Sequence, residues 1–87
     1  MKTNVSKKLI ILYVLNVLKL YSSESTPVGQ TAIANYLNDI DVPCDRKTVG
    51  RNIGYLIDFG YPIKRAGAKG YYLDRAALDA CENKLVI

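Results

Sequence analysis

The chain has 87 residues, 49% of them hydrophobic, and its 12 lysines and arginines against 8 acidic residues give a formal net charge of +4. This length predicts a single domain with an apolar core and little room for a substrate cavity beside it. Because histidine is absent, the usual general base, the imidazole metal ligand and every Ser/His/Asp or Cys/His arrangement are excluded. Cys44 and Cys81 lie far apart and fit neither a zinc site nor a redox motif, so we expect reduced packing thiols and no metal or cofactor.

The first predicted element is a helix from Ser6 to about Tyr21. Its sequence, KKLIILYVLNVLKLY, contains no Pro or Gly, and Ser6 can cap its N-terminus. Apolar side chains cover well over half of its circumference, so we expect one side in the core and another against a second subunit or a neighbouring domain. The apolar run is too short to cross a bilayer and no signal-peptide cleavage site follows it, which favours a cytoplasmic location.

A second helix is predicted from about Gly29 to Asn38, after the turn-rich segment SSESTPVG. Pro43 disfavours a helical conformation in the residue before it, so the chain must break in the linker DIDVPC. Asp39 and Asp41 form an Asp-x-Asp pair in this region. Two carboxylates are too few to indicate a metal site, and we interpret the pair as part of a polar loop.

The third predicted helix, about Arg46 to Phe59, is the best-defined element. Asp45 is a good N-cap, and Gly60 is suited to end the helix. At the helical period, one face is apolar and comprises Val49, Ile53, Leu56 and Ile57. The opposite side carries Lys47, Arg51 and Asp58, flanked by Thr48 and Tyr55. Core and cationic faces are therefore separated.

A hairpin and a fourth helix are predicted after Gly60. YPIKR and GYYL flank AGAK, a strand, turn and strand pattern with glycines at the bend. AGAKG lacks the glycine spacing and the terminal Lys-Ser/Thr of a P-loop, so we interpret it as a turn. The tail DRAALDACENKLVI has Leu78, Cys81 and Leu85 among helix-forming residues, which predicts a C-terminal helix.

Positive charge is concentrated in residues 45–73. This segment has six cations and two acidic residues, so it carries the whole net charge of +4. A cationic surface on one helix and the hairpin after it is typical of proteins that bind nucleic acid. The predicted fold is mainly α with a small β-hairpin (α+β): a winged helix-turn-helix in which the second and third helices form the helix-turn-helix, the hairpin is the wing and a C-terminal helix follows.

The run DRKTVGRNIGYLIDFGYPIKRAGAKGYYL resembles the recognition helix and wing of the N-terminal winged helix-turn-helix domains of bacterial WYL-domain transcriptional regulators, whose pattern is approximately SRKTVYRDIEALREAGYPI followed by a GGYYL-like strand. KKLIILYVLNVL and VGQTAIANYL look like that family's first two helices, so the resemblance covers roughly residues 6–73. The chain departs from the pattern at three positions. Gly29 stands where the family has a capping Ser or Thr, and Gly50 where it often has a bulky aromatic residue. Asn52 stands where the family has Asp. The resemblance implies one domain over residues 1–87, in which residues 74–87 form the C-terminal helix and the start of a linker to an effector-sensing domain.

The resemblance implies a sequence-specific double-stranded DNA-binding domain of a bacterial transcriptional regulator, with the third helix in the major groove and the wing on backbone or minor groove. The expected DNA-binding residues are Arg46, Lys47, Thr48, Gly50, Arg51, Tyr55, Lys64, Arg65 and Lys69. We expect a homodimer through the first or the C-terminal helix, and no enzymatic activity, membrane association or small-molecule ligand in this segment. The alternative is a winged-helix protein–protein interaction module without DNA binding, in which the cations serve solubility, protect the strand edge or meet an acidic partner.

Overall fold

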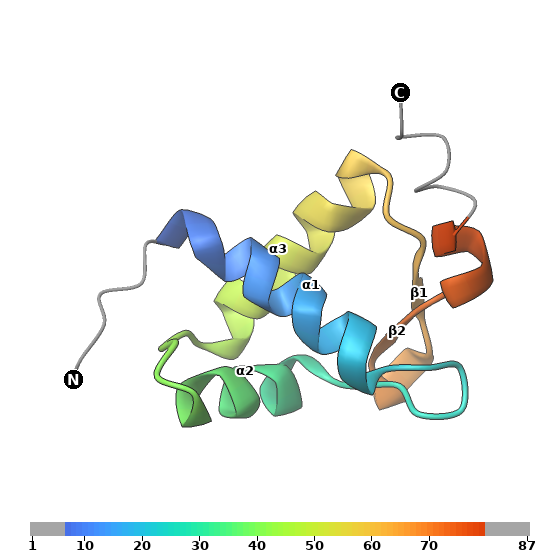
Figure 1. Cartoon of the computed structure of the whole chain (residues 1–87). Coiled ribbons are helices and arrows are strands. Elements are labelled where there is room, and N and C mark those ends of the chain that lie inside the picture. The colour runs from blue at the N-terminus through green and yellow to red at the C-terminus, as the bar shows by residue number, and fades with distance from the viewer. Residues whose placement is uncertain (1–6, 80–87) are drawn as a thin grey trace.

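The computed structural model describes residues 7–79 and confirms the predicted fold class (Figure 1). Its helices are α1 (Ile10–Tyr21), α2 (Gln30–Asp39) and α3 (Arg46–Phe59). They are followed by the antiparallel strands β1 (Ile63–Arg65) and β2 (Tyr71–Leu73), and residues 75–79 are again helical. Figure 1 shows α1 and α3 crossing each other, with α2 running below the crossing and the hairpin to one side.

The observed bounds of α3 match the prediction because a particular residue sets each end. At the start, the Asp45 carboxylate accepts a hydrogen bond from the Thr48 backbone N–H at 2.8 Å. At the end, Gly60 adopts φ 124°, which L side chains rarely adopt, and its N–H donates to the carbonyls of Leu56 and Ile57. Sequence cues at both ends therefore located the helix.

The start of the first helix differs from the prediction. The α-helix begins at Ile10 rather than Ser6, and a 3₁₀ turn, η1 (Lys7–Leu9), precedes it. Ser6 lies outside the described residues. Leu9 occupies the cap position and offers no side-chain acceptor, so the first turn is the tighter 3₁₀ form that is common at helix N-termini. Helix α2 begins one residue later than predicted, with Gly29 as its N-cap.

The core is apolar and draws on every helix and both strands. Its buried members are Ile10, Val14, Leu15, Val17, Leu18, Ile33, Ala34, Leu37, Val42, Val49, Ile53, Leu56, Ile63, Leu73 and Leu78. The predicted core face of α3 was wrong at one edge, because Ile57 is 38% exposed and Asn52 is buried instead. Asn52 is accommodated because its Nδ2 donates to the Thr48 carbonyl at 2.9 Å within the same helix.

The hairpin is attached to the segment between α1 and α2. Val28 and Tyr71 exchange two backbone hydrogen bonds of 2.8 Å, so Val28 extends the two-stranded sheet by one residue. The buried Ser22 hydroxyl accepts from the Leu73 N–H at 3.0 Å and donates to the Leu18 carbonyl at 2.6 Å. These bonds fix β2 against the end of α1.

The outer side of α1 exposes three leucines together with the polar Asn16. Leu9, Leu12 and Leu20 lie there, and Leu12 is 57% exposed. We call these three residues the α1 outer face. Within residues 7–79, no helix has the length and hydropathy needed to cross a membrane.

The C-terminal helix follows β2 directly. The Asp74 carboxylate accepts from the Ala77 N–H at 3.1 Å and so caps its first turn. Leu78 packs into the core. Cys81 and Leu85, which the sequence also assigns to this helix, lie outside the described residues.

Candidate nucleic-acid interface

The first half of α3 carries exposed cations away from the core. Arg46, Lys47 and Arg51 are exposed, while Val49 between them is fully buried. Thr48, which was predicted to point outward, is only half-exposed. Tyr55 lies further along the helix and is 52% exposed. The N-terminal end of α3 adds a partial positive charge to these side chains.

The hairpin supplies a second group of exposed cations, Lys64, Arg65 and Lys69. Lys69 ends the 3₁₀ turn η2 (Gly67–Lys69) that joins the two strands. The Arg65 guanidinium lies over the Tyr71 ring, 5.7 Å from its centroid, in a cation–π arrangement that leaves it exposed. Within the part of the chain that the structure describes, none of the six α3 and hairpin cations forms an ion pair. The hairpin therefore presents its three cations to solvent.

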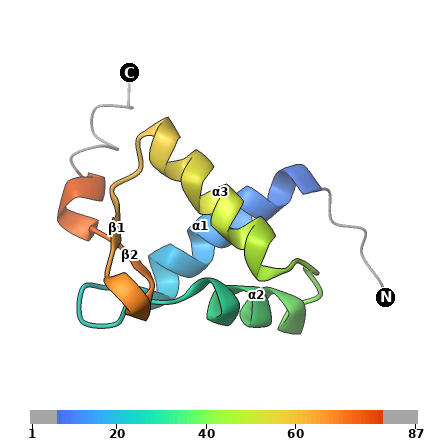
Figure 2. The same cartoon turned by 180° about the vertical axis from the view of Figure 1, so that it is seen from behind.

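Gln30, the first residue of α2, links the two groups of cations. Its Nε2 donates to the Arg46 carbonyl at 2.9 Å, and its Oε1 accepts from the Tyr71 hydroxyl at 3.4 Å. Since the Arg65 guanidinium lies over the Tyr71 ring, a set of contacts joins the start of α3 to the hairpin. Viewed from behind (Figure 2), α3 lies in front of α1, and η2 is close to the N-terminal end of α2.

Gly50 and Gly70 permit this close approach. A Cβ on Gly50 would overlap the Gln30 side-chain amide and lie 3.0 Å from its Cδ. A Cβ on Gly70 would overlap the Val28 carbonyl and lie 2.6 Å from the Gly29 nitrogen. We call the meeting place of Gln30, Gly50, Gly70 and Tyr71 the Gln30 junction. Gly50 was predicted to contact DNA, and the structure shows it half-buried against Gln30.

Sequence reasoning missed three residues that join the hairpin or α3 to other elements: Ser22, Val28 and Gln30. Each acts through one or two hydrogen bonds to a distant part of the chain, so none belongs to a periodic pattern. The glycine at position 50 was the available signal, because a glycine inside a well-capped helix suggests a close neighbour.

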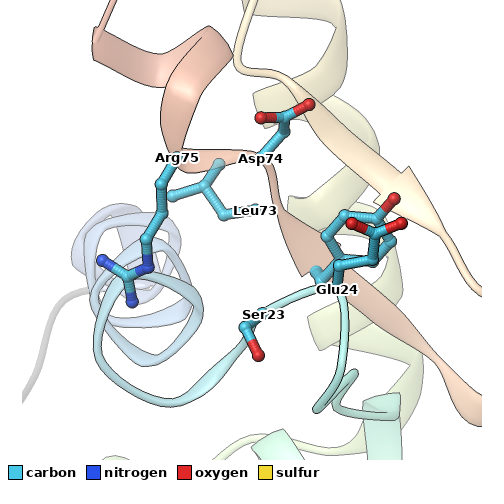
Figure 3. Close-up of a pocket in the computed structure, with 6 residues that line it drawn as sticks. Ser23, Glu24, Leu73, Asp74 and Arg75 are labelled. Atoms are coloured by element: carbon cyan, nitrogen blue, oxygen red, sulfur yellow. The ribbon is translucent and has the colours of Figure 1, made fainter.

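A polar depression of about 290 Å³ lies at the other end of the hairpin, lined by Ser23, Glu24, Tyr72, Leu73, Asp74 and Arg75 (Figure 3). Arg75 reaches from the C-terminal helix toward α1, where its guanidinium donates to the Lys19 carbonyl. Asp74 is occupied in capping the same helix. The depression is lined by two carboxylates, Glu24 and Asp74, and one arginine, Arg75. It therefore does not extend the cationic surface.

The titratable groups near α3 support a structural role for this region rather than a reactive one. Burial raises the pKa of the Cys44 thiol, and the nearby Asp45 carboxylate adds to the increase. A thiol with a raised pKa is a poor nucleophile, in keeping with the predicted packing role. Among residues 7–79, no group of three His, Cys, Asp or Glu side chains could hold a metal ion. Asp39 and Asp41 are both exposed, but only Asp41 lies in a turn, because Asp39 is the last residue of α2 rather than part of the predicted loop.

Three helices, a short turn between the second and third, and a hairpin packed beside the third define a winged-helix-like α+β fold. No protein-family model, curated protein or solved structure matched this chain.

Proposed function

We propose that this chain is a sequence-specific double-stranded DNA-binding domain of a bacterial transcriptional regulator of the WYL-domain type, acting in the cytoplasm. The observation that carries the proposal is the set of exposed cations on the first half of α3 and on the hairpin, two elements that the Gln30 side chain joins through hydrogen bonds. Because DNA presents phosphates on both sides of a groove, two adjacent cationic elements suit it better than one.

In this mechanism, the first half of α3 enters the major groove and the hairpin follows the adjacent backbone or minor groove. Arg51 can bond a guanine edge with two hydrogen bonds or bind a phosphate, and Thr48 suits a phosphate oxygen or a thymine methyl group. Phosphates are bound by the other cations, Arg46, Lys47, Lys64, Arg65 and Lys69. Tyr55 contacts the DNA backbone beside α3. The half-buried Gly50 contributes by letting Gln30 hold the two elements in place.

The salt dependence of duplex binding tests the proposal. If about six cations neutralise phosphates, log affinity should fall against log salt with a slope near −5 per copy of the chain. Fluorescence anisotropy with a labelled duplex, chosen by selection from random sequences, measures this slope. A slope near zero would contradict DNA binding and favour the alternative, a protein–protein interaction module.

Arg51→Ala and Lys69→Ala form a matched pair for separating base recognition from phosphate contact. Arg51→Ala should weaken binding to the selected duplex by about tenfold and relax base preference, because a bidentate contact to guanine is lost. Lys69→Ala should weaken selected and random duplexes equally and reduce the salt slope by about 1. Equal losses on both duplexes for Arg51→Ala would contradict its role in base recognition.

The homodimer remains a prediction, and the α1 outer face is its proposed surface. Light scattering at high protein concentration should give twice the chain mass of 9.7 kDa, and Leu12→Glu should return the mass to that of one chain. A dimer that survives Leu12→Glu would assign pairing to another surface, such as the C-terminal helix. A wild-type monomer would contradict dimerisation.

A further inference from the structure

The side chain of Gln30 is the only group in the described part of the chain that hydrogen-bonds both to α3 and to a hairpin side chain. Its amide uses a donor toward the Arg46 carbonyl and an acceptor toward the Tyr71 hydroxyl. The Arg46 carbonyl belongs to the first turn of α3, the part of the helix that carries the exposed cations. Tyr71 supports the Arg65 guanidinium through its ring.

We infer that Gln30 is a positioning residue that fixes Arg65 of the hairpin relative to the cations of α3. The two cationic elements come from segments that are separated in the chain by Gly60, Tyr61 and Pro62. The hairpin backbone is held by the pairing of Tyr71 with Val28 and by the Leu73–Ser22 hydrogen bond, so Gln30 acts on the Tyr71 side chain and on the Arg65 guanidinium over its ring. The consequence for DNA rests on the proposed function, because the cations must reach phosphates of one duplex together.

The inference also explains a glycine that costs stability. Gly50 and Gly54 both lie in the interior of α3, where glycine is less favourable than alanine. A Cβ on Gly54 would meet no atom within 4 Å, whereas one on Gly50 would displace the Gln30 amide. Gly54→Ala is therefore a matched control for Gly50→Ala, with the same helix and the same chemical change but no contact with the Gln30 junction.

A first experiment tests the placement of Gln30 without DNA. Gly54→Ala should raise the melting temperature by about 4 °C through its helix propensity. Gly50→Ala should give no such increase in the wild-type chain, because its Cβ displaces Gln30 from its two hydrogen bonds. In the Gln30→Ala background, the same substitution should recover the full increase. An equal increase from Gly50→Ala in both backgrounds would overturn the inferred position of Gln30.

A second experiment tests the positioning role by a double-mutant cycle in duplex affinity, well below the melting temperature of every variant. Gln30→Ala and Arg65→Ala should each weaken binding, and the double variant should bind at least about threefold more tightly than the product of the two effects predicts. This coupling arises because Arg65 contributes less once its placement is lost. A change in stability alone would leave the two effects independent, so additive effects would overturn the positioning role.

The two experiments separate failure of this inference from failure of the proposed function. If the wild-type chain binds duplex DNA with the expected salt slope but the affinity cycle is additive, the inference is wrong and the proposed function stands. If the wild-type chain does not bind DNA, the proposed function fails and takes the positioning role toward DNA with it, while the stability cycle still decides whether Gln30 joins the two elements.

Discussion

The apolar core and the Gln30 junction are stabilised by different kinds of contact. In the core, Leu18, Ile33 and Ile53 are at most 1% exposed and pack among residues from several elements. At the junction, individual hydrogen bonds and two close-packed glycines join α2, α3 and the hairpin. Apolar packing is proportional to buried area, whereas a hydrogen bond requires one particular partner. We therefore expect core substitutions to change stability most, and junction substitutions to change stability less while also altering how α3 and the hairpin are placed.

The largest effect should come from the core. Leu18→Ala removes a fully buried side chain and should lower the free energy of unfolding by about 2–5 kcal/mol, through lost burial and the cavity left behind. Leu12→Ala is the matched control, since it makes the same change on the same helix at an exposed position and should cost less than about 0.5 kcal/mol. Denaturant unfolding at low protein concentration measures both. Similar losses for the two variants would contradict the assignment of the two faces of α1.

A smaller effect is expected at the hairpin, where Gly70→Ala tests the junction. Gly70 has φ 115° and lies against the Val28 and Gly29 backbone, so a Cβ there meets atoms that cannot rotate away. We expect a loss of about 2 kcal/mol or more in unfolding free energy, with displacement of β2 from Val28. Gly67→Ala is the control, because Gly67 also has a positive φ, 62°, but its Cβ would meet nothing within 4 Å.

Gly67→Ala should therefore cost only the backbone strain, about 1 kcal/mol. Amide hydrogen exchange at Val28 and Tyr71 distinguishes the two variants, since only Gly70→Ala should break the hydrogen bonds between these residues. Retained protection at both amides in Gly70→Ala would contradict the proposed close packing.

The sequence predicted the elements that depend on local signals. The bounds of α3 followed from Asp45 and Gly60, which act on neighbouring residues, and the hairpin followed from its glycines. The exposed positions of Lys47 and Arg51 followed from the helical period once Val49 was assigned to the core.

What the sequence did not predict depends on contacts between distant residues. Hydropathy assigned Ile57 to the core and did not include Asn52, but Ile57 is exposed, and Asn52 is buried with its amide bonded within α3. Gln30 has no apolar character and no period, so only the position of Gly50 hinted at its contact with α3. The sequence thus located the candidate cations but not the residues that hold them together.

The smallest effect should come from the cap of α3, which lies exposed at the edge of the Gln30 junction. The hydrogen bonds that Asp45 accepts from the Thr48 backbone and side chain lower the pKa of this carboxyl below its usual value of 3.8. A lowered pKa in the folded state means that the ionised carboxylate stabilises the fold at pH values above 3.8 and that this stabilisation disappears as the pH falls through the folded-state pKa.

Asp45→Asn keeps a good capping side chain but removes the titratable charge. It should lower the melting temperature slightly at neutral pH, because the negative charge also interacts favourably with the N-terminal end of α3. The difference in melting temperature between the wild-type chain and Asp45→Asn should shrink to zero as the pH falls below the range in which Asp45 titrates. Thermal unfolding of both proteins across this range measures it, and a difference that persists at the lowest pH would show that the carboxylate charge is not the source of the stabilisation.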